Sequence, residues 1–106
     1  MSDKIVRVVK LNNEKEYQRL IDGTTQSYGT KAGRVYLAAG DHCHEHSTEA
    51  REEILIFLSG QGILKTGDQE NEVGIGSIAY IPPHTLHDVK NIGSDPLIYI
   101  FCVTPV

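Results

Sequence analysis

The 106-residue sequence has no long hydrophobic run and no concentration of basic residues. No segment approaches the roughly 18 apolar residues that a membrane-spanning helix requires, and the stretch MSDKIVRVVK lacks the apolar segment of a signal peptide. We therefore expect a cytoplasmic protein with no membrane partner. The ten Lys and Arg residues are scattered and the formal net charge is -4, so the chain lacks the basic stripe that binds a phosphate backbone. Nucleic acid is not an expected partner.

Cysteine is also scarce, with two residues in the chain. Cys43 lies among histidines, whereas Cys102 lies in the apolar segment PLIYIFCV, where cysteine behaves as a small hydrophobic residue. We expect two free thiols in a reducing compartment.

What the sequence does contain is a series of short apolar segments separated by glycine-containing turns. A length of 106 residues fits one domain of residues 1–106 with one core. Short strands at such spacing predict an all-β sandwich or barrel. The expected strands are residues 4–11, 33–40, 53–60, 62–67, 77–82, 86–91 and 96–103. Residues 13–21 are either one short helix or an edge strand.

The segment GDHCHEHSTEAREE, residues 40–53, contains the main candidate for chemistry. In a strand, successive side chains point to opposite faces, so His42, His44 and His46 would share one face. Neutral imidazole is a common ligand of transition metals, and three such rings could bind one ion. The alternative is that residues 41–52 form a polar surface loop.

Two residues outside the histidine run strengthen the metal interpretation. Glu53 leads into the apolar segment ILIFL, where a bare buried charge is unfavourable, and His87 follows a Pro-Pro turn. A bound metal would satisfy both side chains. Taken singly, Glu53 could instead be a solvated strand end and His87 a hydrogen-bonded core histidine.

The sequence resembles the cupin family of small jelly-roll barrels. The first cupin motif reads Gly, five residues, His-x-His, three or four residues, Glu, six residues, Gly. The residues at these spacings are Gly40, His46, Thr48, Glu53 and Gly60, so that Thr48 stands at the place of the second histidine.

A second motif supports the resemblance. It reads Gly, five residues, Pro-x-Gly, two residues, His, three residues, Asn. The matching residues are Gly76, Pro82, His87 and Asn91, with His84 at the place of the second glycine. The two motifs span residues 40–60 and 76–91, and the resemblance implies a double-stranded β-helix, the jelly-roll barrel of the cupins.

The resemblance also implies a metal site. In metal-binding cupins, the histidines and glutamate of the first motif and the histidine of the second hold one divalent ion. Because Thr48 is a poor ligand for such an ion, we expect a small shift of the strand to bring in the preceding histidine, with His42 as a substitute. The predicted ligands are His44, His46, Glu53 and His87, and the expected ion is Fe, Mn, Ni or Zn. The alternative is a member that has lost its metal.

The resemblance implies that a small molecule is bound or transformed in the barrel cavity, with oxygenase and isomerase chemistry among the options. The alternative is a sugar- or acid-binding sensor that has no catalytic activity and no metal. Tyr36, Phe57 and Tyr80 are candidates for the cavity wall. Small cupins form homodimers by exchanging N-terminal strands, so we expect a homodimer in which residues 4–11 are buried.

Overall fold

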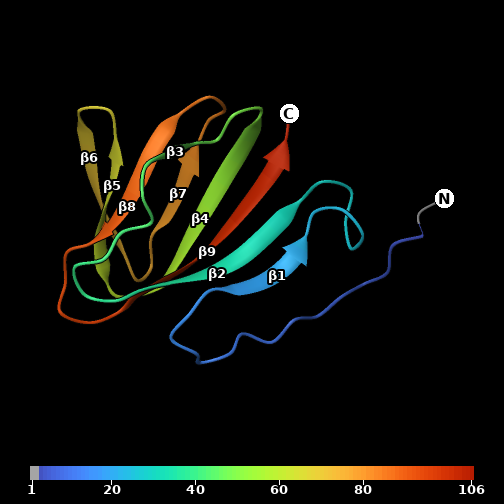
Figure 1. Ribbon diagram of the computed structural model, residues 1–106, viewed down its shortest axis with the longest axis horizontal. Coiled ribbons are helices and arrows are strands. Elements are labelled where there is room, and N and C mark those ends of the chain that lie inside the picture. Colours follow the sequence, from blue (N-terminus) through green and yellow to red (C-terminus); the bar gives the residue numbers. More distant parts are fainter. Residues whose placement is uncertain (1–2) are drawn as a thin grey trace.

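The computed structural model describes residues 3–106, which form nine β-strands in two sheets (Figure 1). The strands are β1 (Gln18–Asp22), β2 (Lys31–Leu37), β3 (His46–Ser47), β4 (Arg51–Ser59), β5 (Gln61–Thr66), β6 (Gln69–Gly74), β7 (Ile78–Ile81), β8 (Leu86–Asn91) and β9 (Leu97–Pro105). The all-β expectation is confirmed. Residues 3–106 contain no helix that is long and apolar enough to cross a membrane.

The two sheets have interleaved connections. One sheet has the strand order β1-β2-β9-β4-β7 and the other has the order β3-β8-β5-β6. Neighbouring strands are antiparallel throughout. The chain therefore crosses repeatedly between the sheets. Strands β4 and β8 belong to different sheets, and the side chains of Glu53 on β4 and His87 on β8 meet between them.

Alternation along β4 shows how the sequence builds the core. Its residues Glu53, Leu55 and Phe57 are buried, whereas Ile54 and Ile56 are exposed on the outer face, as the two-residue period of a strand requires. Apolar side chains from the inner faces of both sheets complete the core, and its members are Leu37, Leu55, Phe57, Leu64, Val73, Ile81, Val89, Leu97 and Tyr99.

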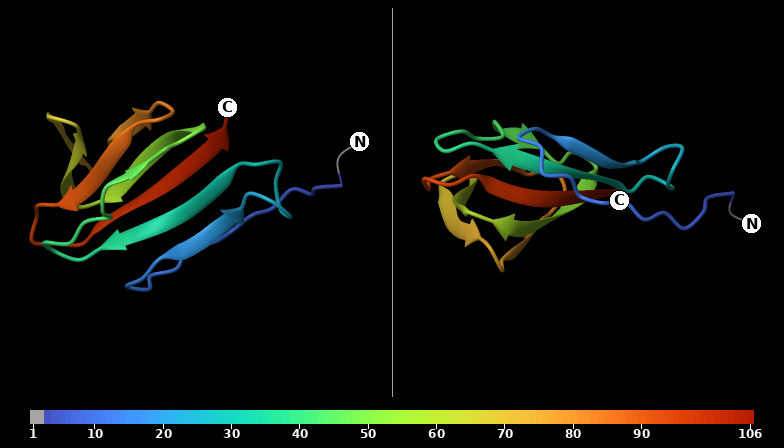
Figure 2. Two further views of the ribbon diagram at one scale, coloured as in Figure 1. Left: turned by 45° about the horizontal axis from the view of Figure 1, so that its top comes forward. Right: turned by 90° about the horizontal axis from the view of Figure 1, so that it is seen from below.

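The strand expectations differ from the structure at residues 4–11, at β6 and at the short strand β3, which was not among the expected strands. Residues 4–11 form no strand. The start of this segment projects beyond the sheets, and the chain then runs alongside β1 (Figure 2). The segment β6 was missed because its sequence QENEVG is mostly polar and exposed. Of the two alternatives for residues 13–21, the edge strand holds for residues 18–21, since β1 forms one edge of the larger sheet and residues 13–17 lie before it.

Candidate metal centre

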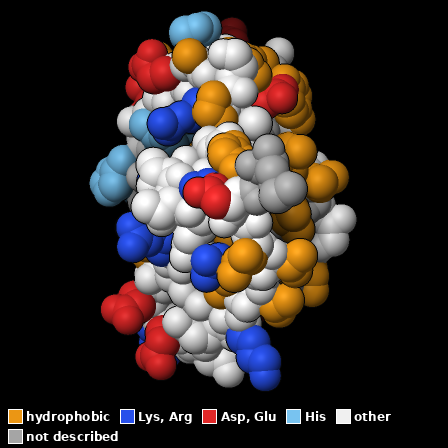
Figure 3. Space-filling view, turned by 90° about the vertical axis from the view of Figure 1, so that its right-hand side faces the viewer, with side chains coloured by type: hydrophobic (Ala, Val, Ile, Leu, Met, Phe, Trp, Pro, Cys, Tyr) orange, Lys and Arg blue, Asp and Glu red, His pale blue; other side chains and the backbone are white. Residues whose placement is uncertain are grey.

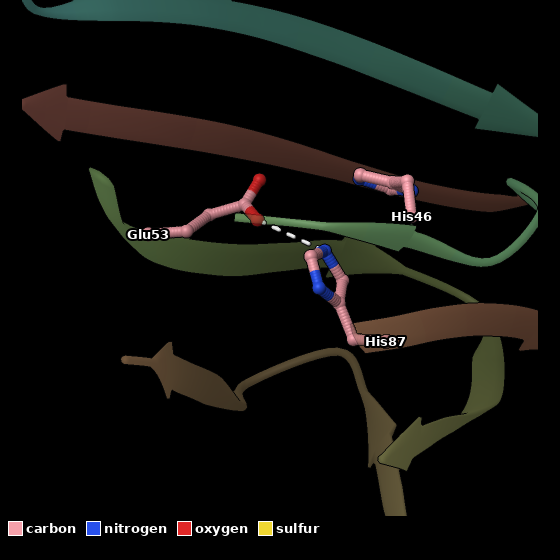
Figure 4. Close-up of side chains that lie close together, drawn as sticks. All are labelled: His46, Glu53 and His87. Carbon is pink, nitrogen blue, oxygen red and sulfur yellow. Dashed lines mark ion pairs between the residues drawn. The ribbon is translucent and has the colours of Figure 1, made fainter. Parts of the chain in front are cut away.

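Two buried residues from facing sheets, Glu53 on β4 and His87 on β8, form the centre of the site. They are 6% and 2% exposed. His87 Nε2 lies 3.1 Å from Glu53 Oε1 (Figure 4). A buried carboxylate needs a charged or coordinating partner, and the imidazole supplies one.

His46 approaches the same pair from the short strand β3. Strand β3 pairs with β8 so that His46 lies opposite His87, and the centroids of the two rings are 4.2 Å apart. Glu53 and His87 point toward each other, and His46 lies beside them (Figure 4). Unlike its two neighbours, His46 is exposed, so the cluster opens to solvent on this side.

Backbone carbonyls orient both imidazoles. His46 Nδ1 lies 2.9 Å from the carbonyl oxygen of His44, and His87 Nδ1 lies 3.0 Å from that of Thr85. In this tautomer each Nδ1–H donates to a carbonyl oxygen, which leaves each Nε2 lone pair for the site. Metal-binding histidines in proteins are commonly held in this way.

The pKa of His87 reflects its surroundings. Burial alone would lower this pKa, but the hydrogen bond to Glu53 and the bond to the Thr85 carbonyl outweigh it, and the charges of Glu53 and Asp88 act in the same direction. The result is a pKa above the ordinary imidazole value. Without a metal, the imidazole of His87 therefore binds a proton more readily than an unperturbed histidine does.

The three residues fit a divalent transition metal. Their ligand atoms lie within 4.8 Å of one another. With metal–ligand bonds of about 2.1 Å, atoms on opposite sides of one ion are about 4.2 Å apart. A small rotation of His46, the exposed member, would close the cluster to this distance. Two imidazoles and one carboxylate are a donor set that leaves coordination positions open.

The structure does not bring His44 into this cluster. Residues 40–45 are not a strand, apart from an isolated bridge between His42 and Lys90, so side chains there do not alternate between two faces. His44 has a positive φ of 73° and is exposed, and its ring lies 4.2 Å from that of His42. His42, the predicted substitute, instead places its Nδ1 2.9 Å from an Asp88 carboxylate oxygen.

Thr48, which stands at the place of the missing motif histidine, makes hydrogen bonds to the backbone. Its buried hydroxyl donates to the carbonyl oxygen of Pro82 at 2.7 Å and accepts from the backbone N–H of Thr85 at 3.0 Å. These bonds join the segment before β4 to the turn before β8. Thr48 thus helps to hold Glu53 and His87 in place without contributing a ligand to the cluster.

A cavity of about 270 Å³ lies next to the cluster. Its lining comprises Lys31, Val35, Cys43, His46, Ser47, Thr48, Arg51, Glu53, Leu55, His87, Val89, Tyr99, Phe101 and Val103. The expected wall residues Tyr36, Phe57 and Tyr80 are not among them. Phe57 is in the core, Tyr80 is 58% exposed, and Tyr36 follows the lining residue Val35 and so faces the other side of β2.

Cys43 is a cavity residue that the sequence did not identify as one. Burial raises the pKa of its thiol to about 11, against opposing hydrogen bonds from Val89 and Tyr99. Its Sγ accepts from the Val89 N–H at 3.2 Å and lies 3.4 Å from an Asp88 oxygen. The thiol is thus protonated at neutral pH and is part of the wall rather than a nucleophile.

Fold and cluster together define a class: a small jelly-roll barrel with a candidate metal centre inside it. The chain belongs to the cupin family. Residues 33–103, about two thirds of the chain, match the cupin domain, and the double-stranded β-helix expected from the sequence is confirmed.

Proteins that are similar to this chain in sequence include two that are named glucose-6-phosphate isomerase. The chain is 35% identical over 88 residues to a glucose-6-phosphate isomerase of Sinorhizobium medicae, an alignment that covers 78% of this chain and 40% of that protein. The glucose-6-phosphate isomerase of Thermococcus kodakarensis is 29% identical over 101 residues, which are 91% of this chain and 52% of that protein. The chain thus spans about half or less of the length of these relatives.

Among solved structures, a cupin protein from Bacteroides fragilis matches all of this chain and 87% of its own, with a TM-score of 0.79 and 20% identity. At that identity, the match shows the fold alone. The cupin fold of the chain is therefore supported by its sequence and by its structure.

Proposed function

We propose that this protein is a metal-dependent cupin that binds one divalent transition metal ion, Fe, Mn, Ni or Zn, and binds or transforms a small molecule in the adjacent cavity. The observation that carries the proposal is the buried Glu53–His87 pair with His46 beside it. The proposed ligands are therefore three of the four predicted from the sequence.

When bound, such an ion supplies a Lewis acid or a site for dioxygen. The chain's own residues do the rest. Thr85 and His44 hold the imidazoles through their carbonyl oxygens, and the apolar wall that includes Leu55 and Val89 limits the water around the site. The relatives named glucose-6-phosphate isomerase favour an isomerase over an oxygenase.

A non-catalytic binding module is the second candidate. Thr48 stands where the first motif has its second histidine, and His46 is exposed. Both features weaken a metal site and therefore favour this second candidate. In that case the cavity would hold a sugar or an acid without metal.

Metal analysis separates the two candidates. The chain, produced without a histidine tag, should carry one transition metal ion per molecule in elemental analysis. His46→Ala and His87→Gln should lose the ion and keep the far-UV circular dichroism spectrum of the parent. His44→Ala is the matched control and should keep the ion, because His44 lies outside the cluster. Full metal content in His87→Gln would rule out the proposed centre.

We propose further that two copies of the chain form a homodimer through the outer face of β4 and β7. Cross-strand pairs there are Ile54 with Tyr80 and Ile56 with Ile78, and these four side chains are 38% to 69% exposed. The outer face of an antiparallel sheet is normally polar if water covers it. Figure 3 shows hydrophobic side chains gathered along one side of the molecule, with most of the charged and histidine side chains on the other.

The exposed N-terminal segment 4–11 supports the same association. Its residues Ile5, Val6 and Val8 are 74%, 92% and 87% exposed, so a second copy could cover them. For the location we propose the cytoplasm, which the free cysteines Cys43 and Cys102 support.

A further inference from the structure

Two cationic side chains, Lys31 and Arg51, line the cavity next to the metal cluster. They stand out because the chain as a whole has a net charge of -4. The only carboxylate among the lining residues is Glu53, and its oxygen is held by His87. The cavity thus has a local charge opposite to that of the protein.

Strand register places both cations on the inner face of the larger sheet. Lys31 on β2 pairs with Val103 on β9, and Val103 pairs in turn with Glu53 on β4. Directly opposed residues project to the same face of a sheet, so these three side chains form one row. Since neighbouring strands are about 4.8 Å apart, the backbones of Lys31 and Glu53 are separated by about 10 Å.

Arg51 lies two residues before Glu53 on β4, so its side chain projects to the same face about 7 Å farther along the strand. Arg51 and Lys31 therefore stand on two sides of Glu53. The apolar residues Val35, Phe101 and Val103 lie on the strands that carry or separate these cations.

Neither cation has a side-chain partner within residues 3–106. Neither residue takes part in the ion pairs His42–Asp88 and His87–Glu53, and no hydrogen bond of residues 3–106 involves the Lys31 ammonium or the Arg51 guanidinium. Lys31 is half-buried and Arg51 is exposed, so both can pair with an anion that enters the cavity.

We propose that Lys31 and Arg51 bind the anionic group of the cavity ligand, which is a small molecule with a carboxylate or phosphate at one end. Its apolar or hydroxylated body lies along Val35, Phe101 and Val103, and its other end reaches the His46–Glu53–His87 cluster. This inference rests on the proposed function for the identity of the cavity as the ligand site, and it adds the chemical class of the ligand. The guanidinium can bind either anion through two parallel hydrogen bonds.

Calorimetric titration of the purified chain with inorganic phosphate and with succinate tests this proposal, with glycerol as the neutral probe. Either anion should bind and glycerol should not. Because a hydrogen bond between two charged groups is stronger than one between neutral groups, Lys31→Gln and Arg51→Gln should each weaken anion binding about tenfold. The matched controls Lys15→Gln and Arg19→Gln, which remove exposed cations outside the cavity, should leave binding unchanged.

The two anions separate the two ligand chemistries: binding of phosphate alone identifies a phosphate ester, and binding of succinate alone identifies an organic acid. Absence of binding for both, or equal weakening in the control variants, would overturn the proposal. Metal content is measured in the same samples. Anion binding without bound metal would refute the metal centre and leave this subsite intact. Bound metal with no effect of Lys31→Gln and Arg51→Gln on anion binding would refute this subsite and leave the metal centre intact.

Discussion

At the scale of single residues, the pair of Glu53 and His87 determines what the cavity can do. Both side chains are buried, so neither is stable alone, and each is the partner of the other at 3.1 Å. The same pair provides two of the three candidate ligands. Proton binding and metal binding at His87 are therefore competitive, because a metal requires the neutral imidazole.

This competition predicts how pH acts on the metal-free protein. The pKa of His87 is raised in the folded chain, so the folded state binds the proton more tightly than the unfolded state. The pair's contribution to stability is fully present below the unfolded-state pKa of about 6.5 and is lost as the pH rises through the folded-state pKa. Urea unfolding of the metal-free protein should show this loss as the pH is raised above about 6.5.

The His87→Gln variant is the control for this measurement, because it removes the titrating imidazole and keeps a hydrogen-bonding group. The difference between the parent and the variant should shrink with rising pH. A difference that grows with pH would contradict the assignment of the raised pKa to the Glu53 interaction.

The four predicted ligands also show why the site could be predicted only in part from the sequence. His46, Glu53 and His87 occupy motif positions whose spacing is set by strand register, and the structure brings the three together. The choice of His44 relied on an extended strand through residues 40–46. The backbone instead turns at His44, with φ of 73°, and no sequence signal marked this turn because the residue there is not glycine.

At the scale of strands and turns, glycines of the motif serve the backbone. Gly40, Gly60 and Gly76 all have positive φ values, at 82°, 89° and 86°, where a side chain is strained. His84 replaces the other motif glycine and also has a positive φ, at 53°. The motif spacing is therefore set by the positions at which strands end as well as by the positions of the ligands.

Two of these glycines differ in their surroundings, which predicts different effects of the same substitution. A Cβ at Gly60 would collide with the Pro96 carbonyl and approach the Leu97 Cα to 2.8 Å, whereas a Cβ at Gly76 would meet nothing within 4 Å. Left-handed backbone costs a non-glycine residue about 1 kcal/mol, and a forced contact adds about 2 kcal/mol. Gly60→Ala should therefore destabilise by about 3 kcal/mol and Gly76→Ala by about 1 kcal/mol.

Denaturant unfolding of both variants checks this difference. Equal losses of unfolding free energy would mean that backbone strain alone, and not the approach of the turn between β4 and β5 to the start of β9, determines the glycine at position 60.

Asn91, the last residue of the second motif, also acts at the scale of strands and turns. Its buried amide donates to the carbonyl oxygens of Leu37 and Asp95, and its Oδ1 accepts from the Gly93 N–H. These bonds connect the end of β2 to the turn between β8 and β9. The last residue of the second motif is thus a structural tie rather than part of the cluster.

At the scale of the whole molecule, the larger sheet carries apolar side chains on both faces. Its inner face packs into the core, and its outer face exposes isoleucines on β4 and β7. Strand β7 also forms an open edge of that sheet, a position that proteins usually protect. A second copy of the chain would cover both features.

The proposed dimer makes a prediction about mass in solution. Ile78→Lys places a charge in the outer face, where the parent residue is 69% exposed, and should convert the dimer to a monomer because an unpaired charge is unfavourable in a buried interface. Size-exclusion chromatography with light scattering measures the change. Ile92→Lys is the matched control, since Ile92 is 60% exposed on a turn outside this face, and it should remain dimeric. A monomeric parent protein at micromolar concentration would contradict the proposal.

The sequence by itself determined the fold class, the family and three members of the cluster, because alternating burial and turn glycines are local properties that a pattern records. Only the tertiary structure decided that His44 lies outside the cluster, that residues 4–11 form no strand within one chain, and that Lys31 and Arg51 share a cavity. Lys31 and Glu53 are 22 positions apart in the sequence and become neighbours across β9 through sheet register. Such register depends on how many strands pack together at once, and no local segment of the sequence specifies it.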